Sequence, residues 1–141
     1  MQCPKPIKSA KVKIKRTEGT RYWVKKCDAV FSLYIRTKNS VNGICQCITC
    51  GGYFDINDID NGHYIPRQNM SLRYSEINCH PQCRKDNWLN QGDSIRYRKA
   101  LVEIYGENRV LLLESTKSKK KTIFELKAIY EYYKNELEEL K

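Results

Sequence analysis

The 141-residue sequence lacks the features that mark several large classes of protein. Its longest apolar run, Val110–Leu113, has the length of a strand and is far too short to cross a membrane. The basic N-terminus has no apolar segment of the kind that a signal peptide requires. There is no glycine-rich loop that could hold a nucleotide. We therefore expect one small domain, and neither a secreted or membrane protein nor an enzyme on a large α/β scaffold.

The chain carries a formal net charge of +10, and acidic residues are scarce in its first third. Residues 1–44 hold eleven lysines and arginines against two acidic residues, whereas residues 45–92 hold four against five. Positive charge of this density attracts polyanions, so we expect residues 1–19 to form a basic arm that binds DNA. A solubilising tail is the alternative explanation. The residues of the arm that we expect to contact DNA are Lys13, Lys15 and Arg16.

The seven cysteines are odd in number and unevenly spaced, which does not fit a disulfide-bonded mini-protein. In a reducing compartment, clustered thiols bind metal ions instead. Cys47 and Cys50 stand three positions apart and are followed by two glycines, a spacing typical of half of a zinc site. Cys83 and Asp86 repeat the spacing, and zinc accepts a carboxylate oxygen, so we predict structural zinc bound by these four residues. Two cysteines are alternatives for the fourth ligand: Cys45 and Cys79.

The sequence predicts an α+β organisation with helices at both ends. Apolar residues recur at helical spacing from Thr20 to Arg36, which indicates an amphipathic helix, and an Asn-Gly turn follows within residues 39–43. The later elements are expected to be a strand at 62–65 closed by Pro66, a polar connector at 67–77, a helix from Cys83, a helix at 97–105, a lysine-rich linker at 117–121 and a helix at 122–140. The corresponding segments are an arm at 1–19, a helix and loop at 20–44, a core at 45–106, and a strand, linker and helix at 107–141.

Three polar residues form a spaced set within this core. Fourteen residues lie between His63 and Asn78, and eight lie between Asn78 and Asn87. The spacing resembles that of HNH, or ββα-metal, nucleases, in which a strand carries a histidine base and a helix carries a metal ligand. The middle asparagine ties down the connector between the two strands. The two halves of the predicted zinc site bracket this set, which makes the pattern more specific than any single motif.

A longer series of motifs extends the resemblance. In chain order these are Asp28–Arg36, Cys47–Gly51, Gly62–Arg67, Asn78–Cys83 and Asn87. Together they resemble the phage NinG/Rap recombination proteins, which act as structure-specific endonucleases on branched DNA and Holliday junctions. The match runs from about Asp28 to Tyr105. The chain departs from the family pattern at Asp86, which replaces a cysteine, and at Cys45, which is additional.

The resemblance implies a small zinc-stabilised ββα-metal (HNH-like) core with flanking helices, working in the cytoplasm of the bacterial host cell. In chemical terms, the neutral imidazole of His63 would take a proton from the attacking water. Asn78 would hold the connector in place. Asn87 would bind one Mg²⁺ or Mn²⁺ ion at the scissile phosphate.

The second protein ligand of that ion has two candidates, because Gly62 stands where many HNH enzymes have Asp or His. His80 ranks first because it follows Asn78 on the strand that faces His63, and Asp60 is the alternative. A zinc ligand or a hydrogen-bond donor to a ligand is the competing role for His80. The arginines that flank the site and are expected to clamp phosphate are Arg67 and Arg73.

Apolar residues of the last helix follow a heptad pattern of fewer than three repeats. They are Ile123, Leu126, Tyr130, Tyr133, Leu137 and Leu140. This stripe either pairs with a second copy or packs on its own domain, and the lysine-rich linker before it favours a helix that projects outward. Since resolving a four-way junction requires two strand cuts, we expect a homodimer held partly by this helix.

The sequence thus predicts a metal-dependent DNA endonuclease that cleaves branched DNA during phage recombination, with no membrane association. Two alternatives remain: a zinc-finger DNA-binding phage protein without catalysis, and an HNH nuclease acting on ordinary duplex DNA. Cleavage assays on plasmid, linear duplex and four-way junction distinguish the three.

Overall fold

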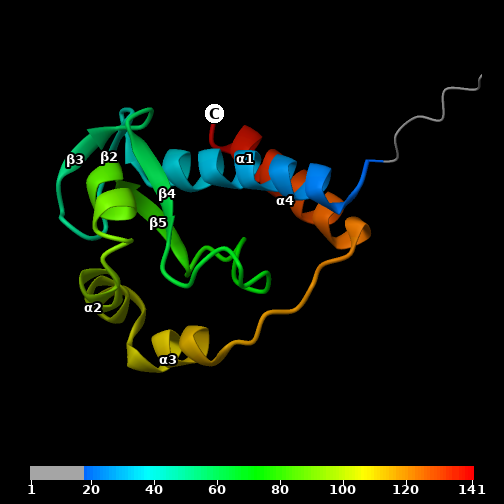
Figure 1. Ribbon diagram of the computed structural model, residues 1–141. Helices are drawn as coiled ribbons and strands as arrows, with labels where there is room; N and C mark the ends of the chain where they lie inside the picture. Colours follow the sequence, from blue (N-terminus) through cyan, green and yellow to red (C-terminus); the bar gives the residue numbers. More distant parts are fainter. Residues whose placement is uncertain (1–17) are drawn as a thin grey trace, which may run out of the picture.

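A computed structural model describes residues 18–141 and shows a small mixed α+β architecture with two small sheets and flanking helices (Figure 1). Most of the predicted basic arm, including Lys13, Lys15 and Arg16, lies outside the described residues. Among the helices of residues 18–141, none is both long enough and apolar enough to cross a membrane.

The first helix, α1 (Thr20–Lys38), confirms the predicted amphipathic segment and runs two residues beyond it. One face of the helix is buried by Cys27, Phe31, Tyr34 and Ile35, which recur at the spacing of successive helical turns. The helix ends at Asn39, whose side-chain amide donates a hydrogen bond of 2.7 Å to the carbonyl oxygen of Ile35.

The first sheet contains three short antiparallel strands in the order β1 (Ser40–Val41), β2 (Ile44–Gln46) and β3 (Tyr53–Asp55). The predicted Asn-Gly turn joins β1 to β2. Both of its residues have positive φ, 50° at Asn42 and 77° at Gly43, as a tight hairpin turn requires. The loop between β2 and β3 holds the Cys47–Cys50 motif.

The second sheet is the hairpin of β4 (Ile59–His63) and β5 (Cys79–Cys83), which pairs Gly62 with His80 and His63 with Cys79. The strand predicted at residues 62–65 therefore begins three residues earlier and ends at His63. Pairing with β5 fixes these bounds, and local sequence does not reveal such pairing. A short π-type helix, η1 (Lys85–Leu89), follows β5.

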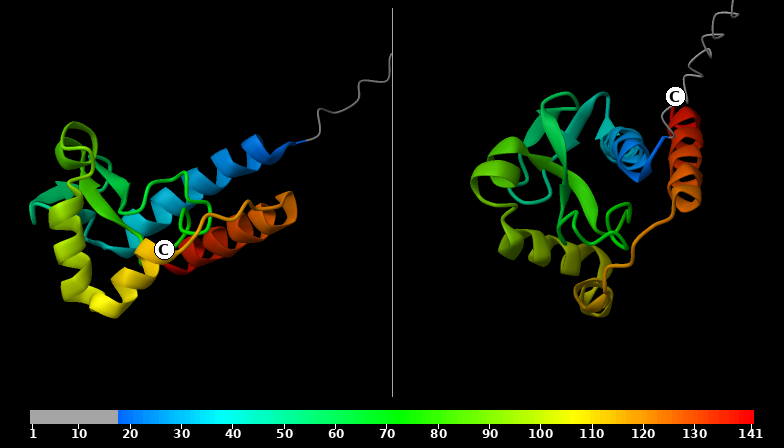
Figure 2. Two further views of the ribbon diagram at one scale, coloured as in Figure 1. Left: turned by 60° about the horizontal axis from the view of Figure 1, so that its bottom comes forward. Right: turned by 45° about the vertical axis from the view of Figure 1, so that its right-hand side comes forward.

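Two helices follow η1 along one edge of the molecule (Figure 2). Helix α2 (Ser94–Tyr105) matches the predicted helix and buries Tyr97 and Leu101. The strand expected at Val110–Leu113 is wrong, because these residues lie in α3 (Glu107–Ser115). Val110 and Leu113 are one helical turn apart and pack together in the same cluster as Tyr97 and Leu101, which is why a helix forms there.

The last helix, α4 (Ile123–Glu139), lies alongside α1 of the same chain (Figure 2). Leu126 and Tyr133 are buried against the apolar face of α1, and the Tyr133 hydroxyl donates a hydrogen bond of 2.9 Å to the carbonyl oxygen of Tyr74. The expectation that this helix projects outward is therefore wrong. The middle of its heptad stripe, at Leu126, Tyr130 and Tyr133, packs on its own domain, whereas Ile123 and Leu140 at the two ends of the stripe are exposed.

The lysine-rich linker between α3 and α4 is pinned to the connector that precedes β5. Ser71 Oγ donates a hydrogen bond of 2.8 Å to the carbonyl oxygen of Lys117, and the amide of Met70 donates one of 3.0 Å to Ser118 Oγ. The linker therefore holds part of the chain that lies between the two strands of the β4–β5 hairpin.

Candidate functional site

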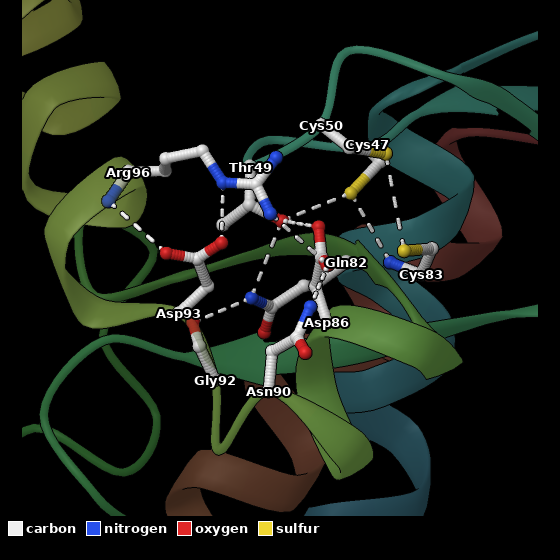
Figure 3. A network of polar contacts seen from close by, with 10 residues as sticks. All are labelled: Cys47, Thr49, Cys50, Gln82, Cys83, Asp86, Asn90, Gly92, Asp93 and Arg96. Carbon is white, nitrogen blue, oxygen red and sulfur yellow. Dashed lines mark hydrogen bonds and ion pairs between the residues drawn. The ribbon is translucent and has the colours of Figure 1, made fainter.

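Four side chains from two distant segments meet at one point beside the β4–β5 hairpin (Figure 3). The thiols of Cys47, Cys50 and Cys83 and a carboxylate oxygen of Asp86 all lie within 4.8 Å of one another. Cys50 Sγ and Cys83 Sγ are 3.9 Å apart. Zinc–sulfur bonds of about 2.3 Å in a tetrahedron would put two sulfur atoms about 3.8 Å apart. The cluster could therefore hold a metal ion such as zinc, and its members are the four residues predicted from the sequence.

Asp86 is held firmly within this cluster. Its side chain is buried, and its two carboxylate oxygens accept hydrogen bonds of 2.7 Å from the Thr49 hydroxyl and from the Asn90 amide (Figure 3). Burial raises the pKa of Asp86, but these hydrogen bonds and the nearby Arg96 outweigh it, so the pKa is lowered overall. Asp86 is thus a carboxylate, the form that binds metal.

Cys47 is also prepared to act as a thiolate. Burial raises the pKa of its thiol, whereas hydrogen bonds from the backbone of Cys50 and from the backbone of Cys83 lower it, to about 7. The amide of Cys83 donates one of these bonds over 3.2 Å. Backbone N–H groups aimed at a sulfur are a common support for metal-binding cysteines.

The two alternative cysteines do not join the cluster. The Cys45 thiol donates a hydrogen bond of 3.2 Å to the carbonyl oxygen of Arg36, and the Cys79 thiol faces the carbonyl oxygen of Arg73. Both are buried among apolar neighbours. Asp86 is therefore the fourth member of the set.

A second feature is an open cleft of about 680 Å³ between β4, η1 and α1. Three of the residues predicted for catalysis or metal binding line it: Asp60, His63 and Asn87. Guanidinium groups also line it, from Arg36, Arg67 and Arg84. The cleft therefore combines a histidine, a carboxylate and an amide with positive charge.

His63 lies at the end of β4 with its ring orientation fixed by the connector. Its Nε2 atom is 2.9 Å from the carbonyl oxygen of Arg73. A carbonyl oxygen only accepts, so Nε2 carries the hydrogen and Nδ1 keeps a free lone pair. Burial lowers the pKa of His63, and the charges of Arg67 and Arg73 lower it further. The imidazole is therefore neutral near pH 7 and can accept a proton.

Asn78 is buried and makes the hydrogen bonds that were predicted for it. Its side-chain oxygen accepts a bond of 2.8 Å from the amide of Ile65. Its side-chain nitrogen donates bonds of 3.0 Å to the carbonyl oxygen of Ile65 and 3.2 Å to that of Leu72. These contacts tie the connector down directly after His63, so Asn78 is a positioning residue.

Asp60 and Asn87 face each other across the cleft. The Asn87 amide nitrogen is 3.2 Å from Asp60 Oδ2, and the indole N–H of Trp88 donates a bond of 2.6 Å to the same oxygen. Asp60 belongs to β4, whereas Asn87 and Trp88 belong to η1. The carboxylate that was the second choice from the sequence is thus the one that the fold brings to Asn87.

His80 is not positioned to share a metal ion with Asn87. It lines a different pocket, and its Nε2 atom lies 2.8 Å from the hydroxyl of Tyr105. It pairs with Gly62 in the hairpin, so its side chain points to the opposite face from that of His63. Burial lowers the pKa of His80 to about 4, which keeps the ring neutral.

Gly62 has a steric reason to be glycine. A Cβ atom at this position would lie 2.7 Å from the Cβ of Gln82, closer than packed side chains allow. The residue before His63 therefore cannot supply a metal ligand in this chain.

The two predicted phosphate-binding arginines differ in their surroundings. Arg67 is exposed at the cleft, and within residues 18–141 its guanidinium makes no hydrogen bond or ion pair. Arg73 instead donates two bonds, of 2.8 and 2.6 Å, to the carboxylate of Asp28 on α1. Arg73 thus fastens the connector to α1 and is not available as a phosphate clamp.

Comparison with known proteins shows the family of this chain. It matches the family described as Bacteriophage Lambda NinG protein over residues 5–141. The chain belongs to the NinG family. It is 31% identical to protein ninG of Escherichia phage lambda and to protein ninG of Salmonella phage P22, each over 122 residues. Protein ninG of Escherichia phage 933W is 30% identical over the same length.

The aligned part covers 85% of this NinG-family chain but only 58% of the lambda and P22 proteins and 59% of the 933W protein. The chain thus spans little more than half the length of these relatives. No solved structure matches the fold.

Several cleft residues of this NinG-family chain were missed by sequence reasoning. They are Arg36, Asn61, Arg84 and Trp88. Arg84 and Trp88 lie close to Asn87 in the sequence, and this closeness could have indicated that they border the same site. Arg36 lies on α1, and nothing in the sequence connects it with β4. Its guanidinium donates a bond of 2.7 Å to the carbonyl oxygen of Ile56 at the edge of the cleft.

Proposed function

We propose that this NinG-family chain is a zinc-stabilised, metal-dependent endonuclease of the HNH type that cleaves branched DNA. The observation that carries the proposal is the convergence of His63, Asp60 and Asn87 in one open cleft lined by arginines. The order of elements around it supports the HNH assignment: an antiparallel hairpin, β4 and β5, is followed by the short helix η1.

The four-residue cluster is proposed to bind structural zinc. It is closed, because its four side chains would fill all four positions around a tetrahedral ion; three of them, Cys47, Cys83 and Asp86, are buried and Cys50 is exposed. Structural zinc sites are closed in this way, whereas catalytic sites keep a position open to solvent. When bound, zinc would join the β2–β3 loop to the segment that carries η1.

His63 is proposed as the general base. Its Nε2–H bond to the carbonyl oxygen of Arg73 leaves Nδ1 to accept the proton of a water molecule. The low pKa of His63, caused mainly by burial, keeps the ring in the basic form at neutral pH. Asn78 maintains this geometry by holding both the residues after His63 and the middle of the connector.

Asp60 and Asn87 are proposed to hold a divalent cation, Mg²⁺ or Mn²⁺. A carboxylate and an amide oxygen are suitable ligands, and both side chains line the open cleft. Such an ion would neutralise the scissile phosphate and the departing 3′ oxygen. Asp60 also accepts hydrogen bonds from Asn87 and Trp88, and Arg84 Nε lies 3.7 Å from its other oxygen.

The positive charge of the cleft supports a nucleic-acid substrate. Arg67 is the exposed guanidinium nearest to His63 in sequence and is proposed to bind a phosphate beside the scissile bond. The basic residues before Thr20, including Lys13, Lys15 and Arg16, are proposed to add affinity that does not depend on sequence.

Cleavage assays test the proposal directly. Purified full-length protein with Mg²⁺ or Mn²⁺ is expected to cleave a four-way junction, and to cleave a linear duplex of the same sequence less. Equal cleavage of both would favour the duplex nuclease. Binding without cleavage in either metal, by zinc-loaded folded protein, would favour a DNA-binding protein without catalysis.

Asn87 offers a more specific test. Asn87→Ala is expected to abolish cleavage at low metal concentration, and excess Mn²⁺ should restore part of it because a ligand has been lost. Asn90→Ala on the same segment is the matched control, since Asn90 donates to Asp86 and does not line the cleft. Loss of cleavage that no metal concentration affects would contradict a ligand role for Asn87.

We also propose that two copies act together on a junction, because each chain offers one His63 and a junction requires two cuts. Because the middle of the α4 heptad stripe packs on α1, we expect the interface to lie mainly outside this stripe. Light scattering of full-length protein on junction DNA tests this. A single copy per junction would make the protein a nickase.

A further inference from the structure

Trp88 is the most exposed aromatic side chain at the cleft. Its side chain is 70% exposed, although indole is among the most costly groups to leave in water. Among the residues that line the cleft it is the one large apolar ring, and its neighbours there are mainly arginines and amides. An aromatic ring beside a cationic cleft matches the two parts of a nucleotide, because the ring can contact the flat base and the arginines can contact the phosphate.

The indole is held in a fixed orientation. Its N–H donates a bond of 2.6 Å to Asp60 Oδ2, so the ring is anchored at its polar edge while most of its surface stays exposed. The helix that carries Trp88 is itself fixed: the amide of Gly92 donates a bond of 2.8 Å to the carbonyl oxygen of Asp86. Gln82 of β5 donates a further bond of 2.7 Å to the carbonyl oxygen of Gly92. An anchored ring loses little conformational entropy on binding.

The position of Trp88 in the chain places it beside the reacting phosphate of the proposed nuclease. It follows Asn87 directly and contacts Asp60, the two proposed ligands of the divalent ion. A base stacked on this ring would therefore be one that flanks the scissile phosphate. Within B-form duplex both faces of a base are covered by its neighbours, so the ring can stack only on a base freed from the helical stack.

We propose that Trp88 stacks on an unstacked nucleobase next to the scissile phosphate and thereby selects branched DNA over continuous duplex. The proposal rests on the proposed nuclease function and deepens it, since it assigns the choice of substrate to one side chain. Stacking of an aromatic ring on a base changes affinity by about 5- to 150-fold.

Tryptophan fluorescence tests this by a readout other than cleavage. The chain has two tryptophans, and the Trp23→Phe variant leaves Trp88 as the only emitter. In full-length protein that also carries His63→Ala, which prevents cutting, an intact four-way junction is expected to quench Trp88 emission. A linear duplex of the same sequence should bind through charge and leave the emission nearly unchanged.

An abasic substitution separates stacking from other contacts. Junctions that lack the bases at the branch should bind wild-type protein about 5- to 150-fold more weakly and should no longer quench Trp88. Trp88→Ala should lose the same factor on the intact junction and show no further loss on the abasic one. Trp88→Phe should retain most of the affinity, because a phenyl ring still stacks.

Leu89→Ala is the matched control, since Leu89 is 80% exposed on the same helix but does not line the cleft. Its affinity for the intact junction should stay within about twofold of wild type, well below the stacking effect. Equal quenching by junction and duplex, or a Trp88→Ala variant as sensitive to abasic sites as wild type, would overturn the proposal.

The two proposals fail separately. If wild-type protein cleaves junctions but Trp88→Ala keeps full affinity and full abasic sensitivity, the stacking proposal is wrong and the nuclease stands. If wild-type protein cleaves no DNA while junctions quench Trp88 in the abasic-sensitive way, the nuclease is wrong and the stacking site stands.

Discussion

Asp86 and Asn87 are neighbours on one short helix, yet they belong to two very different sites. Asp86 is buried in the Cys47–Cys50–Cys83 cluster, and protein donors reach both of its oxygens. Asn87 is only partly buried and faces an open cleft. The closed site is suited to stability and the open site to chemistry.

The comparison also shows how the two sites depend on each other. Helix η1 follows directly from Cys83, so the cluster fixes the helix that presents Asn87 and Trp88 to the cleft. Loss of the metal should therefore disturb the cleft, whereas changes in the cleft should leave the cluster intact.

Removing the cluster should have the largest effect. Cys83→Ser is expected to abolish zinc binding and with it the folded state, because a small core depends on its bound metal. Metal analysis and far-ultraviolet circular dichroism measure both. Cys45→Ser is the control, since Cys45 is equally buried but outside the cluster. A folded wild-type protein without bound metal would contradict a structural role for the cluster.

Removing the proposed base should affect the cleft alone. His63→Ala is expected to lower the cleavage rate by about 10²- to 10⁴-fold, with junction affinity within a few-fold of wild type. Metal content should be unchanged, whereas thermal stability should fall modestly because the carbonyl oxygen of Arg73 loses its partner. His80→Ala serves as the contrast within the same hairpin. It should lower stability by removing a buried group bonded to Tyr105, and the protein that remains folded should still cleave. Near-normal cleavage by His63→Ala would refute the HNH assignment.

A variant at the α1–α4 contact tests whether this contact stabilises the fold or holds two copies together. Leu126→Ala is expected to lower the free energy of unfolding by about 2–5 kcal/mol, because Leu126 is fully buried between the two helices. Denaturant unfolding measures the loss, and the mass from light scattering should not change. Phe124→Ala, at a position 82% exposed on the same helix, should cost less than about 0.5 kcal/mol. A Leu126→Ala variant of reduced mass but normal stability would instead place a dimer interface there.

Replacing the two arginines of the connector should affect different properties: DNA binding for Arg67 and stability for Arg73. Arg67→Ala is expected to weaken binding to all DNA and to reduce the slope of log affinity against log salt by about one, with stability unchanged. Arg73→Ala should instead lower stability, because it leaves the half-buried Asp28 without its partner. Salt titrations and thermal melts of both variants check this. The assignment is wrong if Arg73→Ala changes the salt slope and Arg67→Ala does not.

The pH at which cleavage falls reports the pKa of His63, and we expect only a small change in this pH. Burial, aided by Arg67 and Arg73, lowers the pKa of His63 below its usual 6.5. The base is active when unprotonated, so cleavage should be constant above that pKa and fall as the pH drops through it. A divalent ion nearby would lower the pKa further and keep this sign. The pH profile of kcat/KM should therefore lose activity only below about pH 6.5. Arg67→Ala should move the fall toward higher pH, and a fall centred above pH 7 would contradict the assignment.

Features that depend on local spacing could be predicted from the sequence. Cys47 and Cys50 are close because they stand three positions apart on one tight turn, and Cys83 with Asp86 repeats that spacing. Helix α1 follows from an apolar stripe that is complete within its own residues. The series of His63, Asn78 and Asn87 also carried the resemblance to the NinG family, to which the chain belongs.

Contacts between side chains that are far apart in the chain could not be predicted in this way, because they depend on strand pairing and helix packing. The ring of His80 is held away from the cleft by its contact with Tyr105 of α2, whereas the chain after β5 brings Asn87 against Asp60 of β4. Packing against α2 made a helix of residues 107–115, and the apolar face of α1 took up α4. Arg73 pairs with Asp28 of α1, whereas Arg67 is exposed. Each of these contacts depends on a residue far away in the chain, and local propensity and spacing do not identify that residue.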